Sequence, residues 1–259
     1  MRTKGDESDA KAGILDRSIV NSVAPCIIAA MTLSLSVIIP VYNEKKTIEE
    51  IVRRVRKTGL AQEIIVVDDG SRDGTRDLVR GLEGLDGVRV ILHERNLGKG
   101  AAVRSGIAAA TGEVLLIQDA DLEYDPREYP HLLEPIEAGL ADVVYGSRFL
   151  GAPHRAILFW NMVANKMLTL MTNILYNTIL SDMETGYKVF RREVVQGMPL
   201  RSKRFDFEPE FTAKILKRRF RVFEVAIAFN PRDYDEGKKI GLRDAFQAVW
   251  TLLKYRFVD

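Results

Sequence analysis

The sequence predicts an α/β domain built on a mostly parallel β-sheet with helices on both faces. From Ser34 onward, apolar runs of strand length lead into turn residues and then into amphipathic helical stretches, and this order repeats regularly. Such alternation implies right-handed crossover connections between parallel strands. The composition agrees, because 259 residues of which 46% are hydrophobic and 29% charged suit one large domain, or two small ones, with a proper core.

The strands are expected to be short and buried. The first of them lies in the run LSLSVIIPVY, which is rich in β-branched residues and runs into a proline, as a buried strand does. The five predicted strands are residues 35–40, 63–68, 88–93, 114–118 and 142–145. The predicted helical stretches between them are residues 45–57, 75–82, 99–110 and 126–138. No repeat or low-complexity linker follows, so we assign the remaining residues to the same domain.

The N-terminal segment differs from the rest of the chain. Residues 19–42 carry no charge and are long enough to suggest a membrane span. Their second half is interpreted as the first strand, however, and their first half contains Pro25 and several small residues. We therefore predict that residues 1–30 are a poorly ordered extension and that the domain covers residues 31–259. A signal peptide is the alternative, although the segment before residue 19 has as many acids as bases.

Charge and cysteine content exclude several classes of protein. A net charge of +2 argues against a nucleic-acid binder that relies on bulk electrostatics. No G-x-G-x-x-G motif follows the first strand, which disfavours a dinucleotide-dependent oxidoreductase. The single cysteine, Cys26, excludes a disulfide within the chain and a thiolate metal cluster, so a reducing, cytoplasmic compartment is expected. The positive charge is uneven, since residues 188–221 hold eleven Lys and Arg against four acids.

Polar stretches end or follow all five predicted strands. They are PVYNE, VDDGSRDGT, NLGKG, DADLE and GSR. Taken alone, each is compatible with an ordinary turn or a helix cap. In a parallel sheet, however, the carboxyl ends of the strands meet at one edge, where ligands bind. Five such stretches together therefore predict a ligand site at that edge.

The fourth strand is followed by three acids at alternate positions, Asp119, Asp121 and Glu123. In an extended segment their carboxylates would project to the same side. Three hard oxygen ligands on one side suit Mg²⁺ or Mn²⁺, which screens the repulsion between the acids and keeps open positions for phosphate oxygens. The alternative is a solvated loop or a helix N-cap before Pro126.

These motifs together resemble one known family. The stretches VIIPVYNE, IIVVDDGSRDGT, NLGKGAAVRSG, LIQDADLE and YGSR, in this order, closely resemble glycosyltransferase family two. The later stretches DMETGYKVFRREV, FDFEPEFTAKI and RDYDEGKKIGLRDAFQAVWTLLKYR resemble its branch with dolichol-phosphate mannosyltransferase and polyprenyl-phosphate glucosyltransferases. The resemblance covers residues 34–257. It implies the GT-A fold, a Rossmann-like three-layer α/β arrangement that binds nucleotide sugars.

The resemblance also implies roles for individual residues. The expected nucleotide-sugar site comprises Pro40, Tyr42, Glu44, Val67, Asp69, Asp119, Ala120, Asp121, Arg148, Arg232 and Lys238. The expected catalytic groups among them are Asp119, Asp121 and Arg148. Two more, Arg232 and Lys238, are expected to fold over the donor phosphates from a mobile loop. Many family members have Gln where this chain has Glu123, and the additional negative charge still suits a cation.

The acceptor side of the site is expected around residues 155–181. Residues 156–181 have one charge, that of Lys166, and many Leu, Ile and Met residues together with Phe159 and Trp160. We interpret them as one or two amphipathic helices in the membrane interface, with an ordinary core helix as the alternative. Arg155, at their start, is placed to bind a lipid phosphate, a role that the resemblance also implies.

Two later stretches complete the assignment. The family places acids near the sugar at the DMETGYK motif, so Asp182, Glu184 and Thr185 are expected to recognise it. The helix over residues 242–255 has apolar residues at three-and-four spacing, which indicates packing or membrane contact rather than chemistry. No transmembrane tail follows residue 259, so we predict a peripheral protein on the cytoplasmic face of the membrane. A homo-oligomer is compatible with the sequence.

The favoured hypothesis is an inverting hexosyltransferase that moves mannose from GDP-mannose, or glucose from UDP-glucose, onto polyprenyl or dolichyl phosphate. Breaking the anomeric C–O bond leaves a diphosphate with developing negative charge, which a divalent ion and Arg and Lys side chains stabilise. A lipid phosphate is already an anion and attacks without a general base, which fits the scattered histidines of the sequence. The alternatives are a family-two enzyme with a polysaccharide or other cell-envelope acceptor, and a non-catalytic nucleotide-binding or scaffold protein.

Overall fold

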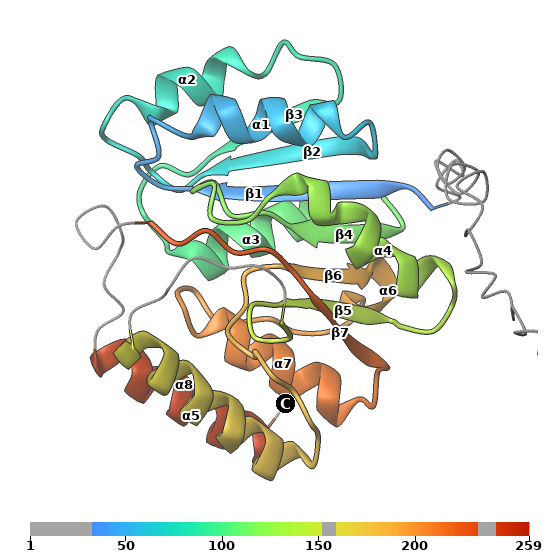
Figure 1. Cartoon of the computed structure of the whole chain (residues 1–259). Helices are drawn as coiled ribbons and strands as arrows, with labels where there is room; N and C mark the ends of the chain where they lie inside the picture. Colours follow the sequence, from blue (N-terminus) through green and yellow to red (C-terminus); the bar gives the residue numbers. More distant parts are fainter. Residues whose placement is uncertain (1–32, 152–158, 233–241, 259) are drawn as a thin grey trace, which may run out of the picture. The chain divides into compact units, whose positions relative to one another are not determined.

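The computed structural model describes residues 33–151, 159–232 and 242–258 of the chain (Figure 1). They belong to one compact unit, Thr32–Asp259. Within this unit a seven-stranded β-sheet is covered by helices on both faces, which confirms the predicted α/β class. The predicted extension of residues 1–30 lies outside the described residues.

Five of the strands are those that the sequence predicts. They are β1 (Leu35–Val41), β2 (Ala61–Asp68), β3 (Val88–Leu92), β4 (Val114–Ile117) and β5 (Val143–Ser147). The sheet order is β3-β2-β1-β4-β6-β5-β7, in which β1 pairs in parallel with both β2 and β4. The carboxyl ends of β1, β2 and β4 therefore meet at one edge, where the sequence places the ligand site.

Two strands were not predicted, β6 (Lys188–Arg191) and β7 (Val222–Ala226). Strand β6 lies between β4 and β5 and runs antiparallel to both, whereas β7 pairs in parallel with β5. Lys188 in β6 is fully buried, although a lysine in a short segment normally indicates an exposed position. The apolar pattern that reveals a buried strand is therefore interrupted in β6.

The first four helices lie where the sequence predicts them. They are α1 (Ile48–Lys57), α2 (Thr75–Gly81), α3 (Lys99–Ala109) and α4 (Tyr129–Glu137). Helix α1 has acids in its first turn and bases in its last, which suits the helix dipole, and it buries one apolar face. The helix predicted to begin at Pro126 begins as a 3₁₀ turn, η1 (Pro126–Glu128), whose Arg127 N–H donates to Asp125 Oδ1 at 2.9 Å.

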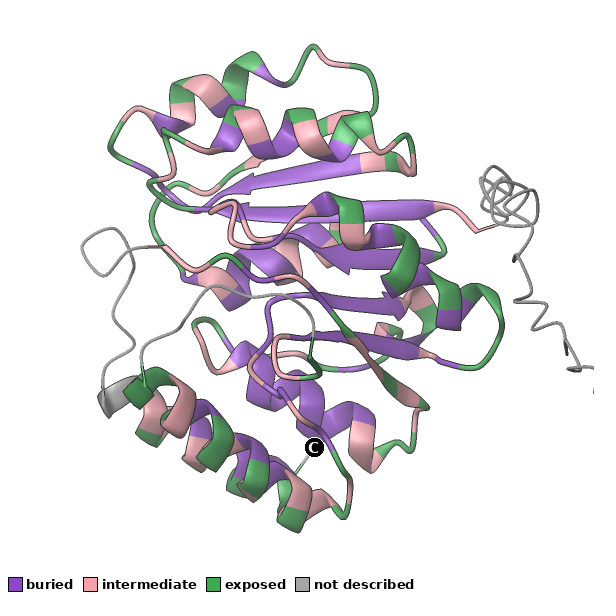
Figure 2. Cartoon of the chain, viewed as in Figure 1, coloured by how far each residue is buried: buried purple, intermediate pink, exposed green. Residues whose placement is uncertain are grey.

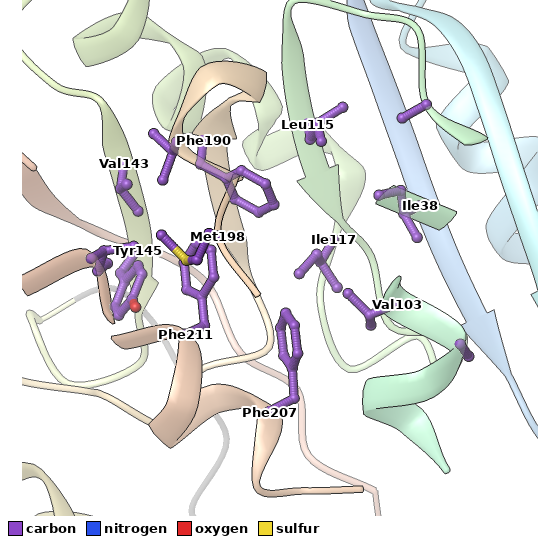
Figure 3. Close-up of a cluster of buried hydrophobic side chains, with 14 of the residues drawn as sticks. Ile38, Val103, Leu115, Ile117, Val143, Tyr145, Phe190, Met198, Phe207 and Phe211 are labelled. Atoms are coloured by element: carbon purple, nitrogen blue, oxygen red, sulfur yellow. The ribbon is translucent and has the colours of Figure 1, made fainter. Parts of the chain in front are cut away.

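The main core lies between the sheet and the helices α3 and α7 (Phe207–Lys217), while α1, α2 and α4 pack on the other face. Figure 3 labels the side chains at the centre of this core, namely Ile38, Val103, Leu115, Ile117, Val143, Tyr145, Phe190, Met198, Phe207 and Phe211. A Cβ at Gly106 of α3 would run into the side chain of Ile38. Glycine at this position therefore lets α3 approach β1 closely.

Helices α5 (Phe159–Tyr176) and α8 (Leu242–Phe257) pack on each other and on α7 as a further layer (Figure 1). Tyr176 Oη donates to the Leu252 carbonyl at 2.7 Å. The prediction for residues 156–181 allowed either one or two helices. The described part of this range contains one helix, of 18 residues. None of the helices in the described ranges is both long and apolar enough to span a bilayer.

Helices α5 and α8 carry large exposed apolar side chains. Figure 2 shows exposed positions along this helix pair. We call this surface the apolar strip, and its residues are Phe159, Trp160, Met167, Leu170, Ile174, Phe246, Trp250, Leu253 and Phe257. Trp160 is 77% exposed and Phe246 is 75% exposed, whereas Thr169 and Thr172 of α5 are buried. Helix α5 is therefore amphipathic in an inverted sense, because it turns small polar side chains inward and large apolar ones outward.

Candidate functional site

The acidic stretch after β4 forms a turn rather than an extended segment. Residues 119–123 belong to no strand, and Leu122 has a left-handed φ of +63°. The expectation of an extended segment is therefore wrong, and the alternation of side chains along a strand does not describe Asp119, Asp121 and Glu123. Across the described ranges, no three acidic, His or Cys side chains are grouped closely enough to hold a metal ion.

Asp119 is paired with Lys99, the first residue of α3. Lys99 Nζ lies 2.8 Å from Asp119 Oδ1 and 3.1 Å from Glu208 Oε1, and Glu208 of α7 is only 5% exposed. Burial by itself lowers the pKa of Lys99, but the carboxylates of Asp119 and Glu208 raise it above its usual value. One charged ammonium group thus joins the acidic turn to both α3 and α7.

A second cation, Arg232, joins the remaining acids of the turn. Its Nη2 lies 2.7 Å from Glu44 Oε2 and 4.0 Å from Asp121 Oδ2, and its backbone N–H donates to Glu123 Oε1 at 3.0 Å. Burial raises the pKa of Glu123; the Arg232 N–H opposes this shift, and the negative charges of Asp119 and Glu44 add to it. Negative charge is therefore concentrated at the turn.

Arg148 and Asp182, which the resemblance assigns to the donor phosphates and the sugar, form a bidentate ion pair. Both of its contacts, Nε to Oδ2 and Nη2 to Oδ1, are 2.7 Å long. Burial raises the pKa of Asp182, but the Arg148 guanidinium outweighs it and holds this pKa below its usual value. Asn165 of α5 donates to Asp182 Oδ1 at 3.1 Å, so the same pair is joined to the helix that carries the apolar strip.

The neighbouring segment of residues 182–188, part of which is predicted to recognise the sugar, contains two ionisable groups with shifted pKa values. Burial raises the pKa of Glu184 to about 8, and Glu208 adds to this shift. Burial lowers the pKa of Lys188 to about 8, and its Nζ donates to the Met183 carbonyl at 3.0 Å. Glu184 Oε1 is buried without a hydrogen-bond partner in the described part of the chain. Groups with such shifted pKa values are frequent at binding and catalytic sites.

The residues predicted for the nucleoside have different environments. Tyr42 is 42% exposed beyond β1, whereas Val67 is fully buried in the core between β2 and α3. The side chain of Val67 therefore belongs to the core, and the predicted contact between this residue and a base remains a prediction. Asp69 is 2% exposed and accepts from the backbone N–H groups of Leu97 at 2.9 Å and Gly98 at 2.7 Å, so it holds the turn that begins α3.

The other predicted site residues divide into three groups. Pro40, within β1, and Ala120, in the acidic turn, are buried. Thr185 is also buried, and its Oγ1 donates to the Gly146 carbonyl at 2.6 Å. Arg155 and Lys238 lie outside the described residues. The roles predicted for Asp69 and for these residues remain predictions.

The carboxylates of Asp119 and Asp121 are of the type that holds a divalent cation, and the metal-ligand role predicted for these two residues and Glu123 remains a prediction. Lys99 contacts Oδ1 of Asp119. At Asp121, Oδ1 accepts from the Glu123 N–H at 3.2 Å and Oδ2 lies 4.0 Å from Arg232 Nη2, so a cation bound there would lie beside Arg232. Mg²⁺ in proteins is commonly held by one or two carboxylates and completed by substrate phosphates. The concentrated negative charge at the turn is of the kind that such an ion stabilises.

The geometry agrees with the comparisons to known proteins. Residues 36–198 match the family model described as Glycosyl transferase family 2. The chain belongs to glycosyltransferase family 2. A polyprenol monophosphomannose synthase from Mycolicibacterium smegmatis is similar to this family 2 chain, with 34% identity over 226 residues, which are 82% of the chain and 84% of that protein.

A dolichol-phosphate mannosyltransferase from Pyrococcus furiosus is 32% identical to the family 2 chain over 231 residues, or 86% of the chain. The chain spans 64% of the length of that relative. The solved structure of glucosyl-3-phosphoglycerate synthase from Mycobacterium tuberculosis with Mn²⁺, uridine diphosphate and phosphoglyceric acid has a TM-score of 0.70 and 22% identity, and covers 88% of this chain and 80% of that chain. This likeness confirms the predicted GT-A fold.

Two residues of this family 2 site were missed by sequence analysis, Lys99 and Glu208. Both lie within stretches that carry the family resemblance, NLGKG and FDFEPEF. Neither stretch indicates that its charged residue meets Asp119, because the contact joins three separate elements. The sequence offered one indication of this contact. Lys99 follows the third strand and Asp119 follows the fourth, so both are expected at the carboxyl edge of the sheet.

Proposed function

We propose that this family 2 chain transfers a hexose from a nucleotide diphosphate sugar to a polyprenyl phosphate at a membrane surface. The apolar strip carries the proposal, because large side chains such as Trp160, which is 77% exposed, are characteristic of surfaces that lie in a membrane interface. The helix that bears the strip also contacts the site directly, through Asn165 and Asp182. A lipid acceptor explains why a sugar-transfer site and an apolar surface share one helix.

The names of the relatives support the class of the acceptor, which they share, more than the identity of the sugar, which differs among them. Four of them refer to dolichol phosphate or to another polyprenyl phosphate, and their sugars are mannose in two cases, galacturonate in one and 4-deoxy-4-formamido-L-arabinose in one. A polyprenyl phosphate is therefore the acceptor class that we propose. GDP-mannose and UDP-glucose are the donors that we propose to test first.

The described residues suggest a division of roles. Mg²⁺ or Mn²⁺, when bound at Asp119 and Asp121, would neutralise charge on the leaving diphosphate. Arg232 supplies fixed positive charge beside Asp121, so we assign it to the donor phosphates. Asp182 holds the Arg148 guanidinium in one orientation, so we assign this pair to the sugar or its phosphate. The acceptor phosphate is already an anion, so attack needs no general base, and a single displacement inverts the anomeric carbon.

The decisive experiment incubates the full-length chain and polyprenyl phosphate with a panel of nucleotide sugars, with and without EDTA. We expect a lipid-linked sugar from one donor and its loss in EDTA. Asp121→Asn should lower turnover about 100-fold or more, because it removes charge next to the leaving group. Asp86→Asn, in an exposed loop, is the control and should leave turnover unchanged. If no donor yields a lipid-linked product, the proposal is wrong.

A further inference from the structure

A cavity of about 610 Å³ lies where the carboxyl ends of α5, α7 and α8 meet. The lining side chains that matter here are Tyr176, Asn177, Thr178, Lys217, Arg219 and Arg256. Three of them are basic, and the described lining includes no acid. The cavity therefore suits an anion.

The arrangement of these groups suits a phosphate in particular. The Arg256 guanidinium lies over the Tyr176 ring at 5.9 Å from its centroid, which restrains its orientation. Arg219 is exposed in the turn after α7, while Lys217 Nζ donates to the Val258 carbonyl at 3.1 Å and completes the wall. Guanidinium groups match the oxygens of a phosphate with pairs of N–H donors. The polar groups of Asn177 and Thr178 add neutral hydrogen-bond partners.

Exposed apolar residues adjoin the cavity lining in the sequence. Ile179, just beyond α5, is 94% exposed, and Phe257, next to Arg256, is 82% exposed. Helix α7 packs behind the α5–α8 pair, so its end lies farther back than the outward face of the strip. A helix in the interface is buried about 5–10 Å into the boundary between headgroups and acyl chains, which would bring the end of α7 to the level of the phosphates.

We propose that this cavity binds the phosphate headgroup of an anionic membrane lipid that is not the acceptor. The inference rests on the proposed membrane docking of α5 and α8. The cavity is separate from the Arg148–Asp182 pair of the proposed sugar-transfer site, because Asn165, which contacts Asp182, is about 16 Å along the α5 axis from Tyr176 at 1.5 Å per residue. The helix pair would then be held on the membrane at both ends.

The test measures binding of the full-length chain to phosphatidylcholine vesicles that contain phosphatidylglycerol. Both tryptophans of the chain, Trp160 and Trp250, lie in the apolar strip, so a blue shift of intrinsic fluorescence reports its insertion. We expect Arg219→Gln/Arg256→Gln to weaken binding about 30-fold, from the usual contribution of two basic residues at an anionic surface. Arg219→Lys/Arg256→Lys keeps both charges but loses the paired N–H donors, so it should bind more weakly than wild type and more tightly than the double Gln variant.

The matched control is Arg56→Gln/Lys57→Gln at the end of α1. These residues line another cavity with basic side chains, and the change removes the same net charge far from the strip. Binding of this control should stay within about 3-fold of wild type. Equal weakening in the two double Gln variants would mean that bulk charge alone is responsible, and would overturn the proposal. No weakening in either would also overturn it, and circular dichroism checks that each variant is folded.

Calorimetry with inorganic phosphate separates the lipid from a soluble anion. If Arg219→Gln/Arg256→Gln loses phosphate binding in solution but binds vesicles like wild type, the cavity takes a soluble anion and the proposal is wrong. If the wild-type chain neither binds vesicles nor shows the blue shift, membrane docking fails and this inference fails with it. If wild type docks and transfers sugar while the two double Gln variants behave alike, only the cavity assignment fails.

Discussion

At the scale of single residues, Lys99 has the largest structural consequence in the site. It lies between Asp119 and Glu208, and the side chain of Glu208 is only 6% exposed. A buried ion pair adds little net stability, because desolvation of the charges offsets their attraction. Removing one partner is costly, however, since the remaining charge is left buried and unpaired. The role of Lys99 is therefore to position two acids from different elements.

We predict that Lys99→Met lowers the free energy of unfolding by about 3 kcal/mol, because Glu208 then loses its counter-ion. Lys99→Met/Glu208→Gln should recover part of this loss, since the neutral amide is cheaper to bury. Urea denaturation measures all three proteins. Lys203→Met, at an exposed position nearby, is the control and should change stability by less than about 0.5 kcal/mol. Equal effects at positions 99 and 203 would contradict the role assigned to Lys99.

Glu184 predicts a pH dependence of stability. Its pKa in the folded chain is about 8, against 4.5 when unperturbed, so the folded state binds the extra proton between these values. The free energy of unfolding should then fall as pH rises from 5 toward 7.5, by at most about 1.4 kcal/mol per pH unit. Glu184→Gln should lack this contribution. Lys188 does not mask it, because its lowered pKa of about 8 leaves it mostly protonated in both states over this range.

The measurement is denaturant unfolding of wild type and Glu184→Gln at several pH values between 5 and 7.5. The stability difference between the two proteins should shift steadily toward the variant as pH increases. Parallel curves would mean that Glu184 is ionised throughout and that its burial does not control its proton.

At the scale of elements, α5 has a polar inward face and an apolar outward face, the reverse of a typical surface helix. Its inward face makes polar contacts, such as the hydrogen bond from Asn165 to Asp182, while its outward face exposes Trp160 and Ile174 to solvent. Exposure of large apolar side chains contributes nothing to the stability of the isolated chain. We infer that the element is shaped by what binds its outward face rather than by folding.

We predict that Trp160→Ser leaves the free energy of unfolding within about 0.5 kcal/mol of wild type, because the side chain is 77% exposed. Its affinity for vesicles should fall about 10-fold or more, from the loss of a large apolar group at the interface. Leu140→Ser is the control, since Leu140 is 55% exposed outside the apolar strip. Vesicle sedimentation measures both variants, and equal affinities would show that Trp160 does not enter the membrane.

At the scale of the whole described unit, stability is concentrated in the middle of the sheet. Every residue of β1 is buried and β1 pairs on both sides, whereas β3 is an edge strand with exposed positions. We predict that the amides of β1 exchange with solvent most slowly and that those of β3 open at a lower free energy. Native-state hydrogen exchange measures both, and equal protection of β1 and β3 would contradict this gradient.

Features that depend on neighbouring residues were predicted from the sequence, whereas features that depend on contacts between distant residues were not. The run Leu35–Val41 is buried throughout and α1 buries one periodic face, so simple patterns identify both. The pattern failed at β6, because its buried Lys188 is satisfied by backbone carbonyls from a loop that no local rule places beside it. It also failed at Leu122, where a left-handed φ in a non-glycine residue turned the predicted straight row of acids into a bend.

The sequence by itself determined the order of the elements from β1 to β5, the family and the position of the acids at the carboxyl edge of the sheet, because these depend on periodicity and contiguous motifs. Only the tertiary structure decided which cation meets which acid, pairing Lys99 with Asp119 and Arg148 with Asp182. The physical reason is that charge pairing acts over a few ångströms in space. Residues far apart in the chain come that close only after the sheet order has brought their elements together.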